Sequence, residues 1–343
     1  MVNLYSDTQT RPTRAMREAM AAAEVGDEQR GEDPTVNELC ARVAELLGKD
    51  AAVFLPSGTM CNAIAVRLHV RPGGDEVILH RWAHPLRFEA GGPAAISGAV
   101  LHPVDGPAGM FDGETLLAAL RPMGDRYAPR SRLVCVEQTT NIGGGRVWPQ
   151  ETLRAVVDVA KRHDMRAHMD GARLMNAVVA SGVAAAQHAD GFDTAWVDFT
   201  KGLGAGVGAC MGASADLIEE AWRYKQMWGG SMRQAGIIAA AGLYALDHHV
   251  DRLAEDHENA RVLAEGLAEI EGIEIDPDEV ETNIVVFGHA DPAGLCAALE
   301  RADVAMGVIG PGQVRAVTHL DVDRSGIERA IAAVRDAVRL ASR

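Results

Sequence analysis

Three stretches in residues 132–169 decide the fold: RLVCV (132–136), ETLRAVVDVAKRH (151–163) and RAHM (166–169). The first and third are short runs of strand length, and the middle stretch has apolar residues at helical spacing. The runs AAVFL (51–55) and EVIL (76–79) extend this alternation toward the N-terminus. Strands that alternate with helices form βαβ units, so the sequence predicts an α/β fold with a mostly parallel sheet and helices on both faces.

The pattern changes after the helical stretch around 237–249. Residues 250–270 form a long amphipathic segment, NIVVF (283–287) is typical of a strand, and a final helix is expected from Arg324. We therefore expect two domains. Residues 1–248 form a large domain that includes the N-terminal segment, and residues 249–343 form a small C-terminal α+β domain.

Composition excludes several classes of protein. The 343 residues carry a formal net charge of -15, which argues against binding to nucleic acid or to an anionic membrane. No apolar run approaches the roughly 20 residues that span a bilayer, and the first residues lack the features of a secretion signal. The five cysteines are scattered, without a CxxC pair or a zinc motif. We expect a cytoplasmic protein with reduced thiols and no bound metal.

Two strand ends carry residues that are suited to binding a cofactor. Ser57-Gly58-Thr59 lies between a strand and a helix, where glycine and the helix N-terminus suit a phosphate group, although a simple helix cap has the same sequence. Asp170 follows the strand 166–169, where its carboxylate suits a protonated pyridine nitrogen, although a strand-end turn is the simpler interpretation.

A lysine completes the set. Lys201 follows the third strand end, about thirty residues after Asp170, among apolar residues and glycines that favour a neutral amine. Taken alone it is equally an exposed loop lysine. In this order and at this spacing, the three features together favour a site for pyridoxal phosphate (PLP), with Lys201 as the Schiff-base residue.

Motifs along nearly the whole chain resemble the low-specificity L-threonine aldolases. These are SDT (6–8), RPT (11–13), GEDPT (31–35), PSGTM (56–60), FEAGG (88–92) after His84, GGGR (143–146), DGARL (170–174), KGLG (201–204), MRQAG (232–236) and VTHL (317–320). The resemblance implies the PLP-dependent transferase-like fold of type I. It also implies an aldehyde-lyase that cleaves a β-hydroxy-α-amino acid, such as threonine or allo-threonine, to glycine and an aldehyde.

The resemblance also implies a role for individual residues. Lys201 binds the cofactor, Asp170 pairs with its ring nitrogen, and His84 stacks on its ring. The phosphate is bound by Gly58 and Thr59, with Arg233 from a neighbouring subunit. The substrate carboxylate is bound by Ser6, Arg173 and Arg315. The implied assembly is a homotetramer, a dimer of dimers whose active sites lie at the dimer interface.

The arginine assignment has a physical basis. A guanidinium group binds a carboxylate through two parallel hydrogen bonds, which orient it as well as hold it. PLP weakens the Cα bond that stands perpendicular to its ring. Carboxylate binding by Arg173 and Arg315 therefore selects cleavage of the Cα–Cβ bond.

Several positions depart from the family pattern. Arg30 stands where tyrosine is common, Tyr127 where a pocket histidine is common, Thr140 in place of histidine and Gln226 in place of lysine. Arg30 and Tyr127 are expected to border the substrate. One hypothesis is that Arg30 binds a polar or anionic β-substituent, as in 3-hydroxyaspartate. The other is that it pairs with Glu28, Glu32 or Asp33.

Alternative functions remain at this stage. With the same Lys201 and Asp170, the chain suits β-elimination, transaldolation or cleavage of another β-substituted amino acid. Residues 204–209 fit GxGxxA, which suggests a nicotinamide oxidoreductase, although the match is short and follows Lys201. A non-enzymatic regulator with a PLP-enzyme fold is a third class, but no DNA-binding module is evident.

Overall fold

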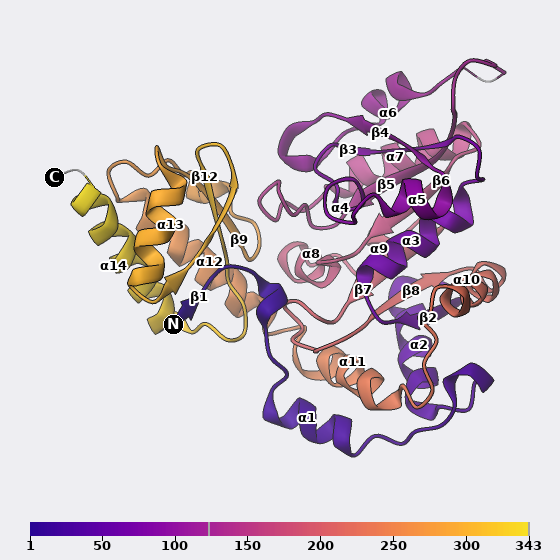
Figure 1. Ribbon diagram of the computed structural model, residues 1–343, viewed down its shortest axis with the longest axis horizontal. Coiled ribbons are helices and arrows are strands. Elements are labelled where there is room, and N and C mark those ends of the chain that lie inside the picture. The colour runs from indigo at the N-terminus through magenta and orange to yellow at the C-terminus, as the bar shows by residue number, and fades with distance from the viewer. Residues whose placement is uncertain (123, 342–343) are drawn as a thin grey trace.

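The computed structural model describes residues 1–122 and 124–341, and its central element is a large twisted sheet (Figure 1). The strand order is β2-β8-β7-β6-β5-β3-β4. Their bounds are β2 Ala51–Leu55, β3 Asp75–His80, β4 Val100–Val104, β5 Arg130–Glu137, β6 Arg166–Asp170, β7 Thr194–Asp198 and β8 Ala209–Ala213. Strands β3 to β7 pair in parallel, whereas β8 is antiparallel to both β7 and β2. The predicted α/β fold with a mostly parallel sheet is confirmed.

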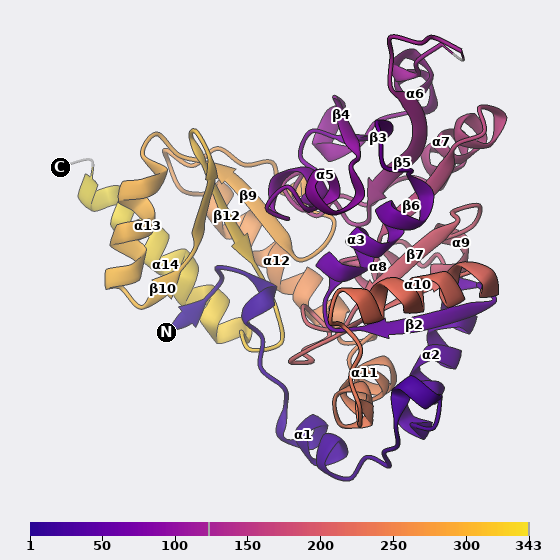
Figure 2. The ribbon, with the colours of Figure 1, turned by 45° about the vertical axis from the view of Figure 1, so that its right-hand side comes forward.

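Helices cover both faces of this sheet. The helices of this part of the chain are α1 Arg14–Ala21, α2 Pro34–Leu47, α3 Gly58–His69, α4 His84–Arg87, α5 Gly92–Ser97, α6 Gly113–Ala119, α7 Gln150–Arg162, α8 Leu174–Ser181, α9 Ala185–His188, α10 Ala215–Met227 and α11 Gly236–His248, of which α1 packs on α11. Alternate residues of one strand enter different cores: Val134 packs with α2, α7 and α11, and Cys135 packs with α3. Figure 2 shows α2 and α11 on one side of β2 and α10 on the other.

The remaining residues form a second, smaller core. It contains α12 Leu253–Ala268, β9 Ile284–Gly288, α13 Pro292–Arg301, β10 Val304–Ala305, β11 Gly307–Gly310, β12 Gln313–Val317 and α14 Arg324–Ala341. Strands β11-β12-β9 form an antiparallel sheet. The N-terminal strand β1, Val2–Asn3, pairs in parallel with β10, and Val2 and Leu4 are buried in this second core. The first residues therefore pack with the C-terminal part, and the domain boundary at residue 248 stays a prediction.

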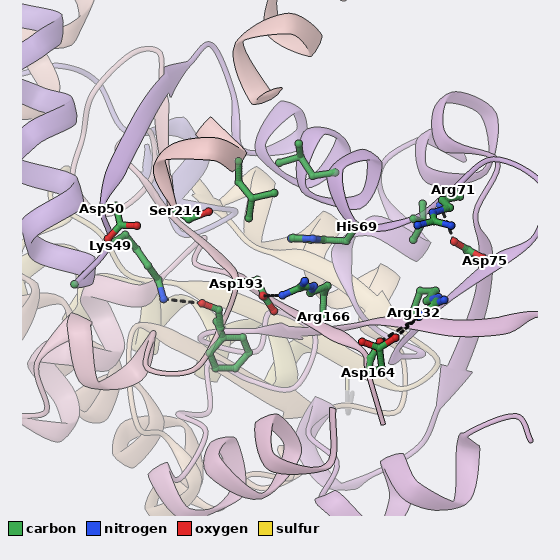
Figure 3. A pocket seen from close by; sticks show the side chains of 15 residues that line it. Lys49, Asp50, His69, Arg71, Asp75, Arg132, Asp164, Arg166, Asp193 and Ser214 are labelled. Carbon is green, nitrogen blue, oxygen red and sulfur yellow. Dashed lines mark hydrogen bonds and ion pairs between the residues drawn. The ribbon is translucent and has the colours of Figure 1, made fainter. Parts of the chain in front are cut away.

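The two edges of the parallel strands differ. At the amino edge lies a polar cavity of about 700 Å³, called here the amino-edge cavity, which is lined by Lys49, His69, Arg132, Asp164, Arg166 and Asp193 among others (Figure 3). Two ion pairs line it, each at 2.8 Å, Arg132 with Asp164 and Arg166 with Asp193. At the carboxyl edge, β5, β6 and β7 end in the acidic residues Glu137, Asp170 and Asp198.

No helix in the described ranges is long and apolar enough to cross a membrane.

Candidate active site

Lys201 lies just beyond the carboxyl end of β7. Its amine donates a hydrogen bond to Asp198, the last residue of that strand, and its side chain is 18% exposed. The backbone carbonyl of Lys201 accepts a hydrogen bond from Thr10 Oγ1 at 2.9 Å, which ties the N-terminal segment to the turn. The amine also lies 5.8 Å from the centre of the Trp196 ring. Lys201 is thus a partly exposed amine in a structured turn.

Asp170 is the last residue of β6 and is buried. Oδ1 accepts a hydrogen bond from the backbone N–H of Ala172 at 3.0 Å, and Oδ2 accepts one from Asn62 Nδ2 at 2.7 Å. These two hydrogen bonds fix the position of the carboxylate at the end of β6.

His84 begins α4 and is held by two glutamates. Its Nδ1 lies 2.8 Å from Glu89 Oε1, and its backbone N–H donates to Glu137 Oε2 at 3.0 Å. Burial lowers the pKa of His84, but the hydrogen bond with Glu89 and the charges of Asp170, Glu89 and Glu137 outweigh this and leave the pKa raised. Burial, aided by the charge of Asp170, raises the pKa of Glu137 to about 7.

A cavity of about 370 Å³ brings five of the predicted residues together: Ser6, His84, Arg173, Lys201 and Arg315. It lies between the carboxyl edge of the large sheet and strand β11, from which Val308 and Ile309 line it. Both cores therefore contribute to one site.

The two cavity arginines have different partners. Arg173 donates from Nε and Nη2 to the two oxygens of Asp7 at 2.8 and 2.7 Å, and both side chains are buried. Burial alone would raise the pKa of Asp7, but the charge and hydrogen bonds of Arg173 outweigh this effect and lower the pKa to about 2. Arg315 donates from Nη1 to Asn141 Oδ1 at 2.7 Å, while its buried Nε has no hydrogen-bond partner among the described residues. Burial, together with the charge of Arg173, lowers the pKa of Arg315.

Gly58 and Thr59 open α3, and the cap interpretation describes this turn correctly: Ser57 Oγ accepts a hydrogen bond from the N–H of Met60 at 3.2 Å. Gly58 is also needed for packing, because a Cβ atom there would lie 2.2 Å from the Trp196 ring. The same ring lies near Lys201, so the N-terminus of α3 and the lysine share a neighbour.

The structure does not bring Arg30, Tyr127 or Arg233 into this chain's cavity. The side chain of Arg30 is 71% exposed and pairs with Glu32 at 2.9 Å. Tyr127 is 99% exposed. Arg233 is 65% exposed and pairs with Asp27 at 2.9 Å. Of the other departures from the family pattern, Thr140 is buried and Gln226 is exposed.

Sequence reasoning missed several residues that support the site. Four of them lie outside every motif quoted above: Asn62, Glu137, Asn141 and Trp196. Asp7 and Glu89 lie within quoted motifs, which gave a signal that they matter but not that they pair with Arg173 and His84.

Comparisons with known proteins agree with this geometry. The family model of the beta-eliminating lyases matches residues 3–290. The chain is 39% identical over 346 residues to low-specificity L-threonine aldolase 1 of Arabidopsis thaliana, which covers 98% of this chain and 96% of that protein. It is 41% identical over 325 residues to the low specificity L-threonine aldolase of Escherichia coli (strain K12), which covers 94% and 95%.

Among solved structures, the fold is similar to that of Leishmania major threonine aldolase, with a TM-score of 0.85 at 21% identity over 98% of this chain and 99% of the other. This chain therefore belongs to the beta-eliminating lyase family, in the group that contains the low-specificity L-threonine aldolases.

Proposed function

We propose that the cavity around Lys201 is the active site of a PLP-dependent aldolase that cleaves a β-hydroxy-α-amino acid to glycine and an aldehyde. The observation that carries the proposal is the meeting, in one cavity, of a lysine at a strand end with two arginines, beside a buried aspartate at the next strand end. When bound, PLP supplies the electron sink that accepts the electron pair of the cleaved Cα–Cβ bond.

The residues present fit this cofactor. Lys201 offers the amine that binds its aldehyde carbon, and Asp170 offers a carboxylate for its ring nitrogen. His84 offers a flat ring beside them. The backbone N–H groups of Gly58 and Thr59, at the start of a twelve-residue helix, suit its phosphate.

Substrate binding follows from the remaining donors. Arg315 has a buried Nε without a partner among the described residues, which suits one oxygen of a substrate carboxylate. Arg173 lies in the same cavity and is fixed in place by Asp7, and Ser6 adds a hydroxyl group. Retro-aldol cleavage also requires loss of the β-hydroxyl proton. Nε2 of His84 is the nitrogen not bonded to Glu89, and it suits this proton transfer.

The assembly proposed is a homotetramer in the cytoplasm, with Arg233 of a neighbouring subunit at the phosphate. Two observations support association: Tyr5, Phe88 and Val308 line the cavity yet are each about half exposed, and the side chain of Arg233 extends into solvent. The five free cysteines agree with a reducing compartment. The 3-hydroxyaspartate alternative rests on Arg30, which pairs with Glu32 outside this chain's cavity.

The decisive experiment combines spectroscopy with product analysis. Purified protein is expected to be yellow. Borohydride treatment followed by peptide mapping is expected to find the reduced cofactor on Lys201, and Lys201→Ala is expected to lose both colour and turnover. Lys225 is the matched control, because its fully buried amine is bonded to Glu28 at 2.8 Å. A label on Lys225 would overturn the assignment, and a keto acid with ammonia in place of glycine would identify elimination.

A further inference from the structure

One amide group, that of Asn62 on α3, connects the two carboxylates beside the proposed cofactor site. Asn62 is buried, and its Nδ2 donates at 2.7 Å to Asp170 Oδ2 and at 2.7 Å to Glu89 Oε1. Glu89 in turn holds His84. The residue proposed to pair with the ring nitrogen and the residue proposed to stack on the ring are therefore linked through a single side chain.

The orientation of this amide is fixed by its other end. Asn62 Oδ1 accepts a hydrogen bond from Trp196 Nε1 at 2.9 Å and lies 3.0 Å from His168 Nε2. An indole N–H only donates, so the oxygen of Asn62 must face Trp196. The two N–H groups of the amide consequently face the two carboxylates.

The same constraint fixes the tautomer of His168. Burial lowers the pKa of His168 to about 3, so its ring is neutral near pH 7 and carries one N–H. Because Nε2 must donate to Asn62 Oδ1, Nδ1 is left as an acceptor, and Thr194 Oγ1 lies 2.8 Å from it. His168 and Thr194 are paired residues on β6 and β7, so the sheet itself sets this contact.

The chain of hydrogen bonds continues to the opposite edge of the sheet. His69 Nε2 lies 3.2 Å from Thr194 Oγ1, and His69 lines the amino-edge cavity (Figure 3). Burial lowers the pKa of His69 to about 4, so it is also neutral. The donors of His69, Thr194 and His168 then all point toward Asn62, whose amide donates to Asp170 and Glu89.

We propose that Asn62 is a positioning residue that holds the Asp170 and Glu89 carboxylates in place, and that Trp196 and His168, which both donate to its oxygen, fix the orientation of its amide. The inference rests on the proposed role of Asp170 at the cofactor. Two carboxylates near one another repel, and an amide that donates one N–H to each opposes that repulsion. Loss of the Asn62 N–H is not easily compensated at Glu89, because the other oxygen of that carboxylate, Oε2, is already buried without a hydrogen-bond partner among the described residues.

The first test uses Asn62→Ala and Asn62→Asp, with Asn259→Ala as the matched control. Asn259 is also buried, but its amide donates only to the carbonyl of Val322, in the second core. Titration of apoenzyme with PLP is expected to show affinity reduced about tenfold or more in both Asn62 variants, with the control unchanged. With saturating cofactor, kcat is expected to fall while the amino-acid KM stays within about twofold, because Asn62 does not line the cavity.

The variant Asp170→Ala distinguishes failure of the proposed cofactor site from failure of the proposed role of Asn62. If Asp170→Ala leaves PLP affinity unchanged, the proposed cofactor site is wrong. If Asp170→Ala weakens PLP binding while Asn62→Ala does not, the site stands and the positioning role of Asn62 is wrong.

The second test does not depend on the cofactor or on the Asn62 variants folding. Nitrogen-15 NMR of the apoprotein is expected to show His168 neutral with its proton on Nε2, assigned by the loss of that signal in His168→Gln. Thr194→Val keeps the side-chain shape and removes the hydroxyl beside Nδ1; because Asn62 Oδ1 still requires a donor at Nε2, the proton is expected to stay on Nε2. A wild-type proton on Nδ1, or a proton that moves to Nδ1 in Thr194→Val, would refute the fixed orientation.

Discussion

At the scale of residues, the pair of Asp7 and Arg173 shows how the site holds a charge away from water. Both side chains are buried, and the guanidinium group meets both carboxylate oxygens. Asn283 Nδ2 adds a third hydrogen bond to Asp7, at 3.1 Å. A buried charge that loses its partner is far more costly than the intact pair is stabilising. Asp7 therefore keeps Arg173 charged and oriented within the cavity.

Asp7→Asn is expected to destabilise the protein by about 3–5 kcal/mol near neutral pH, because Arg173 loses its counter-charge. The pKa of Asp7 is lowered to about 2. A lowered carboxyl pKa gives stability that is present above the unfolded pKa and is lost as the pH falls through the folded one. The difference between wild type and Asp7→Asn should thus shrink by about 2 kcal/mol between about pH 5 and pH 2.

Urea unfolding at a series of pH values measures this difference. Glu18→Gln is the control, since Glu18 forms an exposed ion pair with Arg14 and its loss should change little at any pH. A wild-type-to-variant difference for Asp7→Asn that does not depend on pH would contradict the assignment.

Sequence reasoning finds residues that are recognisable from their type and their position in a local motif. It misses residues whose role depends on hydrogen-bond partners that are distant in the sequence. Lys201 and Asp170 are found because each follows a strand, where side chains gather at one edge of a parallel sheet. Asn62 is missed because its partners are Glu89, His168, Asp170 and Trp196, which only the fold brings together. The choice for Arg30 was open in the sequence, and the structure pairs it with Glu32.

At the scale of elements, the predicted strands and the helix 151–163 agree closely with β2, β3, β5, β6 and α7. The direction of β8 was not predictable, because its sequence, ACMGA, is buried throughout and shows no alternation. Residues 204–209, which fit GxGxxA, show that a short motif can match outside its usual structural context. They join β7 to the antiparallel β8, whereas a dinucleotide site requires a turn from a strand into a helix. The nicotinamide alternative, which requires such a turn at residues 204–209, is therefore wrong.

The first turn of α3 gives a testable case. Gly58→Ala is expected to destabilise the protein by about 1–3 kcal/mol and to weaken PLP binding, because the added methyl group meets the buried ring of Trp196. Gly92→Ala is the matched control: Gly92 also begins a helix, α5, but a Cβ there meets no atom within 4 Å. Thermal unfolding and PLP titration compare the two. Equal effects of both substitutions would show that the contact with Trp196 is unimportant.

At the scale of the whole molecule, the cavity joins the large sheet to β11 and β12 of the second core. If the site also uses Arg233 of a neighbour, two inactive variants should rescue each other. Lys201→Ala and Arg233→Ala, refolded together in equal amounts, should recover up to about a quarter of wild-type activity, because half of the dimers are mixed and each contains one complete site. Each variant refolded alone is the control. Mixed dimers without activity would place Arg233 outside the shared site.

The pairing of β1 with β10 joins residues 2–3 to residues 304–305. Closing so long a loop carries a large entropic cost, which must be met before the contact contributes. On a ribosome, β2 to β8 are all synthesised by residue 213, whereas β1 can pair only after β10 has emerged. The large core can consequently form before the second core is complete. The start of the chain is made first and docked last, and until then its apolar side chains need protection from aggregation.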